Sequence, residues 1–266
     1  MLKVMTFNIR YGTAEDGLNH WQRRRGAAMA RIRAADPDLL GLQECRADEQ
    51  AEYVKSALPD YSFWGLPRGG DDATGLEMAP TLWRTSAFEA LRRGMFWLSE
   101  TPDVPASISW NSTFARVVTW VELRHRASNR ALMFACTHFD TTATAIAGAA
   151  HVLREWVEAQ GDAPLIVVGD FNAGQNSAAF AQLAAGGRLA EAFRLAHPGS
   201  AGPGATFHGY GQAGGHEAID WILISPHLAV TTAAVDRHQV EGLYPSDHYP
   251  VTASLRWAET PGSSGA

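Results

Sequence analysis

The sequence predicts a mixed α/β fold in which two mixed β-sheets pack face to face and helices cover their outer sides. Residues 165–168 are short and strongly apolar, which is typical of a strand buried on both faces. Helix-like segments follow some such strands and hairpin-like stretches connect others, as expected for layered sheets. No linker and no repeat of roughly 20–50 residues divides the chain. We therefore expect one domain over residues 1–258 and a flexible Pro/Gly/Ser-rich tail over residues 259–266.

The bulk composition is that of an ordinary globular protein with a full core. The chain has 266 residues, of which 46% are hydrophobic and 19% are charged, and its mean hydropathy is −0.16. Apolar runs fall well short of the ~20 residues that a membrane span requires, and the first residues are typical of a strand rather than a signal peptide. Two cysteines, Cys45 and Cys136, are too few for a disulfide framework. We expect a cytoplasmic protein with no membrane partner.

The charge balance disfavours one class of partner. The formal net charge is −6 and the isoelectric point is near 5.9. A protein that grips a long duplex usually presents a basic face, because neutralised phosphates supply most of the affinity. The dense basic run, residues 23–25, falls within a predicted helix. Tight non-specific binding of DNA is therefore not expected, whereas a small phosphorylated substrate is compatible with this charge.

Elements of the N-terminal part are predicted from periodicity and from chain breakers. A helix over residues 21–35 places Trp21, Ala28 and Ile32 on roughly one face, and Asp36-Pro37 ends it. A second helix is expected over residues 46–58. Strands are expected over residues 3–9, 39–44, 61–66, 81–84 and 88–99, with a glycine-rich loop over 68–76 and an irregular stretch over 103–112.

The C-terminal part contains more strands than helices. Residues 116–123 alternate in polarity and are rich in Val, Thr and Trp, which favours a strand. Further strands are expected over residues 131–139, 164–170, 219–224, 229–235 and 250–257. Helices are expected over the alanine-rich residues 142–160 and over residues 177–185, and a long Gly/Pro/His loop over residues 197–217.

Gly169-Asp170-Phe171-Asn172 follows the most apolar strand. Strand side chains alternate, so Asp170 and Asn172 should point the same way from the strand end. A buried carboxylate without a partner would cost several kcal/mol, on the order of the penalty for any unpaired buried charge. We therefore expect a metal ion or a protonated histidine beside Asp170, although a strand that runs into a simple Asx turn would explain the same four residues.

Other polar residues also lie at strand ends. Asn8, Glu44 and the His138/Asp140 pair occupy C-terminal strand ends, as Asp170 and Asn172 do. Asp220 and the Asp247-His248 pair instead precede their strands. If those last strands run antiparallel to the earlier ones, all of these groups gather at one rim, which is the usual location of chemistry on a sheet. Each residue has an ordinary structural explanation, so the joint arrangement indicates a functional site.

With these residues identified, the chain resembles the endonuclease/exonuclease/phosphatase superfamily. The resemblance spans nearly the whole chain, and its motifs occur in the family's order. It implies a four-layer α/β sandwich and Mg²⁺- or Mn²⁺-dependent hydrolysis of phosphate esters. Residues 96–102, Arg116 and residues 206–209 resemble a bacterial subgroup of metal-dependent hydrolases. The matching motifs are Thr6-Phe7-Asn8-Ile9, Leu42-Gln43-Glu44, Thr137-His138-Phe139-Asp140, Gly169-Asp170-Phe171-Asn172, Ile219-Asp220-Trp221 and Ser246-Asp247-His248-Tyr249-Pro250-Val251.

The resemblance also implies a role for each site residue. Glu44 would bind the metal, with Asn8 and Asp247 helping to hold metal or phosphate. Asp170 would orient or deprotonate the attacking water. The remaining catalytic roles would fall to Asn172 on a phosphate oxygen, to Asp220 on the imidazole of His248, and to His248 and His138 on the phosphoryl oxygens, with His138 able to protonate the leaving oxygen. The substrate-binding residues would be Arg10, Glu77, Arg116, Asp140 and His208.

Several readings of the substrate stay open. Arg10 stands where DNA-repair members of the family carry an acid, which argues against that substrate class. We expect a phosphodiester or a phosphomonoester of a small molecule, sugar or lipid headgroup, and the sequence does not choose between the two. The alternatives are a DNA or RNA nuclease, which the net charge disfavours, and a non-catalytic module that holds a phosphorylated partner, which would be expected to have lost Asp170 or His248.

Overall fold

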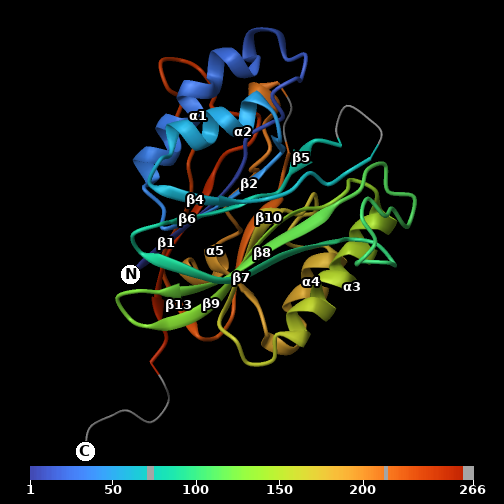
Figure 1. Cartoon of the computed structure of the whole chain (residues 1–266), viewed down its shortest axis with the longest axis vertical. Coiled ribbons are helices and arrows are strands. Elements are labelled where there is room, and N and C mark those ends of the chain that lie inside the picture. Colours follow the sequence, from blue (N-terminus) through green and yellow to red (C-terminus); the bar gives the residue numbers. More distant parts are fainter. Residues whose placement is uncertain (71–74, 213–214, 260–266) are drawn as a thin grey trace, which may run out of the picture.

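The computed structural model describes residues 1–70, 75–212 and 215–259. The expected tail, apart from Glu259, and parts of the expected loops over 68–76 and 197–217 lie outside the described residues. The regular structure of the described residues consists of two six-stranded sheets, one two-stranded sheet and the helices that cover the two large sheets (Figure 1). The division into a single domain over residues 1–258 stays a prediction.

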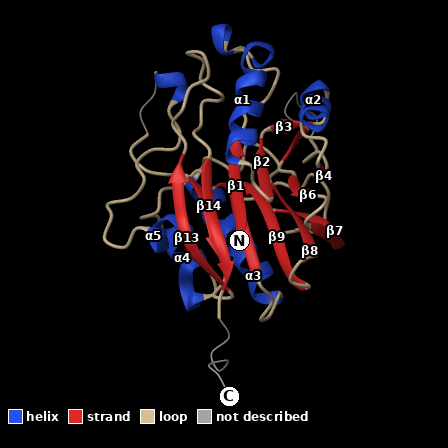
Figure 2. Cartoon of the chain, turned by 90° about the vertical axis from the view of Figure 1, so that its left-hand side faces the viewer, coloured by secondary structure: helices blue, strands red, loops and turns tan. Residues whose placement is uncertain are grey.

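The first sheet combines strands from both ends of the chain. Its strands are β1 (Leu2–Asn8), β2 (Leu39–Gln43), β4 (Tyr61–Trp64), β6 (Thr81–Arg84), β13 (Leu228–Val235) and β14 (Val251–Trp257). They are arranged in the order β13-β14-β1-β2-β6-β4, and Figure 2 shows the first four side by side. β1 and β2 are parallel, and all other neighbours are antiparallel.

The second sheet is built from one continuous portion of the chain. Its strands are β7 (Phe88–Trp97), β8 (Val117–His125), β9 (Arg130–His138), β10 (Leu165–Asp170), β11 (Ala190–Glu191) and β12 (Asp220–Ile224). The order is β11-β12-β10-β9-β8-β7, with β9 and β10 as the parallel pair. The two sheets therefore have the same order of parallel and antiparallel neighbours from one edge to the other. Each has a single parallel pair, which lies in the middle.

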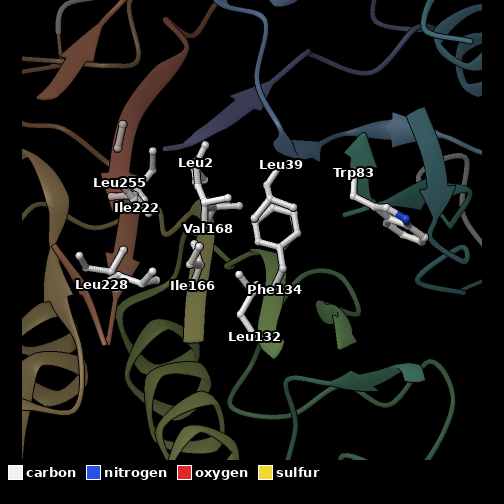
Figure 3. Packing of buried hydrophobic residues seen from close by; sticks show 14 of the residues in the cluster. Leu2, Leu39, Trp83, Leu132, Phe134, Ile166, Val168, Ile222, Leu228 and Leu255 are labelled. Atoms are coloured by element: carbon white, nitrogen blue, oxygen red, sulfur yellow. The ribbon is translucent and has the colours of Figure 1, made fainter. Parts of the chain in front are cut away.

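Helices cover the outer face of each sheet, so the molecule has four layers (Figure 1). α1 (Trp21–Ala35) and α2 (Glu49–Ala57) pack on the first sheet, and α3 (Ala143–Ala159) and α4 (Ala178–Ala184) pack on the second. Side chains alternate between the layers: Ile166 packs in the core between the sheets (Figure 3), whereas Val167 packs toward the helices. The predicted four-layer α/β sandwich is confirmed.

The sheets approach closely near their polar rim because β2 carries a glycine. A Cβ on Gly41 would lie 2.3 Å from Cγ2 of Val168 and 2.9 Å from Sγ of Cys136, both on the second sheet. Any larger residue would push the sheets apart at this point. Cys45 and Cys136 are both free and buried, and both belong to the hydrophobic core.

Most predicted elements are observed with boundaries that shift by a few residues. The helix expected over residues 46–58 begins only at Glu49, because Cys45–Arg46 (β3) pairs with Glu77–Met78 (β5). Asp48 then caps α2 by accepting a hydrogen bond from Gln50 N. The elements that were not predicted are too short to leave a periodic pattern. They are β3, β5, β11, α5 (Ala192–Ala196) and the 3₁₀ turns Gly17–Asn19, Ala185–Gly187 and Gly209–Gly211. Among the described helices, none combines the length and the apolarity needed to span a bilayer.

Candidate active site

Polar side chains from both sheets meet where the two parallel strand pairs end. Asn8 ends β1 and Glu44 directly follows β2. His138 and Asp170 end β9 and β10, and they are register partners in the parallel pair. All four are buried. The carboxyl ends of parallel strands therefore supply the first half of the site.

The other half comes from strands that run in the opposite direction. β12 is antiparallel to β10, and its first residue, Asp220, is the register partner of Asp170. β14 is antiparallel to β1, so Asp247 and His248, just before β14, reach the same rim. The condition on which the common rim depended, an antiparallel direction of these two strands, is therefore met.

Most of these groups line a pocket of about 460 Å³, and Asn8 and Asp220 contact it through their hydrogen bonds to Asp170 and His248. A larger hollow of about 840 Å³ lies at the opposite ends of the strands, beside Arg130 and Trp257, and none of the predicted site residues lines it. We place the chemistry in the smaller pocket, because acids, amides and imidazoles converge there. Its lining residues are Arg10, Tyr11, Glu44, Arg68, Glu77, Phe114, Arg116, His138, Thr141, Asp170, Asn172, Phe207, Ile219, Asp247 and His248.

Asn8 links the acids of the two sheets. Its Nδ2 donates to Glu44 Oε1 and to Asp170 Oδ2, each at 3.0 Å. Its Oδ1 accepts from the backbone N of Arg10 at 2.9 Å, which fixes the orientation of the amide. The backbone carbonyl of Asn8 accepts from Ser246 Oγ at 2.7 Å, so the loop before His248 is tied to the same residue.

Three strand ends turn through left-handed backbone conformations at this rim. Arg10, Glu44 and Asn172 have φ values of 53°, 58° and 48°. Residues other than glycine rarely adopt this region, and such strain is concentrated at functional sites. Each turn directs a polar side chain to the rim at the point where its strand stops.

Arg10 lies among the acids of the first sheet. Its Nε and Nη2 donate to the Asp16 carboxylate at 3.1 and 3.0 Å. The same guanidinium lies 3.9 Å from Glu44 and 3.7 Å from Asp247. Arg10 thus lines the pocket but is held by Asp16, away from a direct hydrogen bond to either site acid.

His248 is held as a cation between two carboxylates. Its Nδ1 lies 2.9 Å from Asp220 Oδ2, and its Nε2 lies 3.7 Å from Asp170 Oδ2. Burial opposes the charge, but Asp220 and Asp170 raise the pKa of His248 to about 10. Burial and the neighbouring Asp220 charge in turn raise the pKa of Asp170 to about 7. Asp170 is therefore poised between its neutral and ionised forms near neutral pH.

His138 approaches Asp170 from the other side. Its Nε2 lies 3.5 Å from Asp170 Oδ2. Burial and the positive charges of Arg116 and Arg68 hold the pKa of His138 well below its usual range, so the imidazole is neutral. Asn172 is fixed by its backbone N, which donates to Asp170 Oδ1, and by its Nδ2, which donates to the carbonyl of Phe139, each at 2.9 Å.

The pocket wall beyond His138 carries two arginines. Arg68 pairs with Glu77 through two contacts of 3.2 Å, one to each carboxylate oxygen. Arg116 lies on the same wall, and both guanidinium groups lie over the ring of Phe114. Burial raises the pKa of Glu77 to about 7.

The sequence model of the Endonuclease/Exonuclease/phosphatase family matches residues 5–248. The chain belongs to this family. Its members are phosphoesterase or nuclease hydrolases that generally depend on divalent metal ions. The family predicted from the motifs is therefore confirmed.

Solved structures and one curated relative resemble the chain over most of its length. An endonuclease/exonuclease/phosphatase from Bacteroides vulgatus is 30% identical, with a TM-score of 0.86 and coverage of 97% of this chain and 99% of that one. The mannosyl-6-phosphatase of Bacteroides thetaiotaomicron is 26% identical, with a TM-score of 0.86 and coverage of 97% and 100%. An uncharacterized protein of Acanthamoeba polyphaga mimivirus is 28% identical over 184 residues, which are 64% of this chain and 67% of the viral protein.

The acids of the first sheet fit the family's need for a divalent cation. The carboxylates of Glu44 and Asp247 and the side-chain oxygen of Asn8 are hard ligands, as Mg²⁺ and Mn²⁺ prefer. Arg10 lies near both carboxylates, but its hydrogen bonds go to Asp16. Burial and the Glu44 charge raise the pKa of Asp247, as expected for a carboxylate that lacks sufficient positive charge.

A second group of potential ligands is less suitable. Asp170, Asp220 and His248 have ligand atoms within 4.8 Å of one another. His248 is protonated below about pH 10, however, and a protonated imidazole has no lone pair to offer a metal. The oxygen atoms on the Glu44 side of the pocket are therefore the more suitable ligands for a hard cation.

Two residues expected to bind substrate are not brought into the pocket lining. Asp140 instead accepts hydrogen bonds from Ser112 Oγ and from the backbone N of Thr113 and of Thr142, and so fixes the loop before Arg116. His208 is buried and stacks on Tyr249, with ring centroids 3.9 Å apart. Its place in the structure is behind the His248 loop rather than in the pocket.

Sequence reasoning missed two residues that hold the site together. Arg24 is buried, and its Nη1 donates to the carbonyls of Ile9 and Pro245 at 2.6 and 3.1 Å. An arginine in a basic helical run gives no signal of this role. Thr206 Oγ1 accepts from the backbone N of Ile219 and of Asp220, and its place in the subgroup motif was the available signal.

Proposed function

We propose that this protein is a Mg²⁺- or Mn²⁺-dependent hydrolase of small phosphate esters. One observation carries the proposal: Oδ2 of Asp170 lies within 3.0 Å of Asn8, 3.5 Å of His138 and 3.7 Å of His248 beside the 460 Å³ pocket. A potential base, Asp170, is thus surrounded by an amide donor and two imidazoles. In-line displacement at phosphorus requires such an arrangement, with one activated water and several donors around the phosphoryl oxygens.

Each group has a role that its charge supports. Asp170, ionised above about pH 7, orients the attacking water and accepts its proton. His248 is a cation that donates from Nε2 to a phosphoryl oxygen, while Asp220 holds its Nδ1. Neutral His138 donates a hydrogen bond to the phosphoryl group or the leaving oxygen. The Asn172 side chain lies beside it on the pocket lining.

Glu44 would hold the metal ion, with Asp247 and Asn8 completing the protein ligands. When bound, the ion supplies electrostatic stabilisation to the phosphoryl oxygens. Asn8 fixes the position of the Glu44 carboxylate relative to that of Asp170, because its Nδ2 donates a hydrogen bond to both.

The pocket and the charge of the chain favour a small substrate. A pocket of about 460 Å³ is the size of a ligand site rather than of a long polymer groove. The net charge of −6 gives no general attraction to nucleic acid. The similar mannosyl-6-phosphatase acts, by its name, on a sugar phosphate.

Both cysteines are free thiols, which supports a reducing, cytoplasmic setting.

Release of product from three substrates tests the proposal. Wild-type protein, Asp170→Asn and the control Asp162→Asn are assayed with p-nitrophenyl phosphate, bis(p-nitrophenyl) phosphate and nicked plasmid, in Mg²⁺, in Mn²⁺ and in EDTA. Asp162 is 98% exposed, so its variant should match wild type. We expect metal-dependent release of nitrophenol and a loss of roughly 10²-fold or more in Asp170→Asn.

Each alternative gives a different result. Full activity in Asp170→Asn would remove the proposed mechanism. Cleavage of the plasmid alone would identify a nuclease. Absence of turnover on all three substrates would favour a module that only binds phosphorylated partners.

A further inference from the structure

Arg10 lies beside both acids proposed to hold the metal ion, yet it stays outside hydrogen-bonding distance of each. Its Nη1 is 3.9 Å from Glu44 Oε2, and its Nε is 3.7 Å from Asp247 Oδ2. These are ion-pair distances that are too long for hydrogen bonds. A shift of roughly 1 Å would bring the guanidinium into direct hydrogen bonds with both carboxylates. The exact position of Arg10 therefore decides whether the oxygens of these acids are free to bind a metal ion.

Asp16 holds the guanidinium of Arg10 in this position. Its carboxylate oxygens accept from Nε at 3.1 Å and from Nη2 at 3.0 Å, the paired geometry that fits the planar fork of arginine. Tyr210 donates its hydroxyl to the same carboxylate at 3.2 Å and so fixes Asp16 from a distant part of the chain. The Arg10 and Asp16 side chains are 28% and 14% exposed, so water screens this pair less than it screens a surface pair.

The Asp16 side chain is not used by its own turn. Asp16 directly precedes the 3₁₀ turn Gly17–Asn19, at a position where an aspartate ordinarily caps the turn with its side chain, but it makes no such hydrogen bond. The turn is instead attached through Arg24, whose Nε donates to the carbonyl of Asn19 and whose Nη2 donates to the carbonyl of Arg10. The carboxylate of Asp16 is therefore directed to Arg10 rather than to local structure.

The backbone of Arg10 is fixed independently of its side chain. Its N donates to Asn8 Oδ1 at 2.9 Å, and its carbonyl accepts from Gln50 Nε2 at 2.9 Å and from Arg24 Nη2 at 3.0 Å. Loss of the Asp16 carboxylate would leave these three bonds in place and release only the guanidinium. The two acids of the metal site, both within 4.0 Å, would then be its next partners.

We infer that Asp16 is a positioning residue that holds Arg10 away from the two acids of the metal site and so keeps their oxygens available to a divalent cation. This role rests on the metal site of the function proposed above. Without Asp16, charge-assisted hydrogen bonds from Arg10 would occupy oxygens of Glu44 and Asp247. The positive charge of Arg10, no longer balanced by Asp16, would also lower the affinity of the pocket for a cation.

Calorimetric titration of the metal-free protein with Mg²⁺ and with Mn²⁺ tests this role. The proteins are wild type, Glu44→Gln, Asp16→Ala, Arg10→Ala and the double variant Arg10→Ala/Asp16→Ala. We expect Asp16→Ala to bind metal roughly tenfold or more weakly than wild type. Arg10→Ala should bind at least as tightly as wild type, and the double variant should return to within about threefold of wild type, because the competing guanidinium is gone.

The control removes the same charge from the neighbouring residue. Glu15 is exposed, so Glu15→Ala should bind metal as wild type does. Asp16→Asn keeps the shape of the side chain without its charge, and it serves if Asp16→Ala does not fold. Its metal affinity should fall between those of wild type and Asp16→Ala.

Thermal melts distinguish a positioning role from a purely structural one. A carboxylate that only supports the fold would lower the Tm in EDTA when removed and leave the metal affinity of the folded protein unchanged. We expect instead that the rise in Tm on adding metal shrinks in Asp16→Ala and returns in the double variant.

The other outcomes overturn the role of Asp16 in distinguishable ways. Weak binding that persists in the double variant would make Asp16 a ligand or a structural residue. Metal binding that is lost in Glu44→Gln but unchanged in Asp16→Ala would remove the role of Asp16 alone. If wild type binds neither ion, the proposed metal site fails and the role of Asp16 fails with it.

Discussion

The side-chain amide of Asn8 donates a hydrogen bond to Oδ2 of Asp170 at 3.0 Å, although the two residues are 162 positions apart in the chain. Asn8 ends a strand of the first sheet and Asp170 ends a strand of the second. This bond therefore joins the two sheets at the pocket, and it is a favourable contact for a carboxylate that is otherwise costly to bury. The consequences of that burial can be measured.

Replacing Asp170 by Asn should stabilise the metal-free protein at alkaline pH. Burial raises the pKa of Asp170 from 3.8 to about 7, so the folded state holds this proton more tightly than the unfolded chain does. The cost of ionising Asp170 in the folded state is absent below pH 3.8, grows as the pH rises, and is complete above about pH 7. In EDTA at pH 8 we expect a higher Tm for Asp170→Asn, by about 2–4 °C for each kcal/mol relieved, with the difference vanishing near pH 4. A Tm at or below that of wild type at pH 8 would contradict this balance of charges.

Replacing Asp220 by Asn should make activity fall at lower pH. Against the effect of burial, Asp220 and Asp170 raise the pKa of His248 to about 10, above its ordinary value of 6.5. The stabilisation from the charged imidazole is therefore complete below pH 6.5 and is lost as the pH rises through about 10. Without Asp220, His248 should lose its proton earlier, and kcat/KM should drop by roughly tenfold or more between pH 6 and pH 9. Parallel pH–rate profiles for variant and wild type would show that Asp220 does not set the charge of His248.

Replacing Glu44 by Gln should abolish the response of the protein to metal. A ligand that binds only the folded state raises its stability, so Mg²⁺ or Mn²⁺ should increase the Tm of wild type. We expect calorimetric metal affinity to fall at least about tenfold in Glu44→Gln. Glu49→Gln, at an exposed position at the start of α2, serves as the control and should bind metal as wild type does. Unchanged metal affinity in Glu44→Gln would show that Glu44 is not a ligand and that the metal binds elsewhere.

Replacing Arg24 by Ala should destabilise the fold and impair the site together. Arg24 is 1% exposed, and its guanidinium donates to the carbonyls of Ile9, Arg10 and Pro245. Its loss leaves these buried acceptors unsatisfied, and we expect the free energy of unfolding to fall by roughly 2–4 kcal/mol in urea titrations. The exposed Arg23→Ala should change it by no more than about 0.5 kcal/mol. An Arg24→Ala protein as stable as wild type would show that these bonds are dispensable.

Much of the fold could be predicted because its core strands are strongly patterned. Runs such as residues 165–168 are apolar on both faces, which is the pattern of a strand between a helix layer and a second sheet. The direction of β12 and β14 entered the sequence analysis only as a condition, and the structure meets it. The pairing of β3 with β5 could not be predicted, because two-residue strands depend on a contact between distant segments rather than on local pattern.

The candidate site could be predicted where polar residues stand at the end of an apolar strand. Asn8, Glu44 and Asp170 stand out for that reason. Arg24 and Arg68 do not, because their partners are backbone carbonyls and a carboxylate that only the tertiary structure brings near. His208 lies in a matching motif, yet its ring packs on Tyr249, since sequence position alone does not fix side-chain direction.

The distribution of strands between the two sheets has a consequence for biosynthesis. The second sheet comes from one uninterrupted portion of the chain, whereas β14 must return to insert between β1 and β13. A nascent polypeptide that stalls before residue 247 therefore leaves the edge of β1 open and lacks both Asp247 and His248. Synthesis of β14 should therefore close the first sheet and complete the candidate site in the same step.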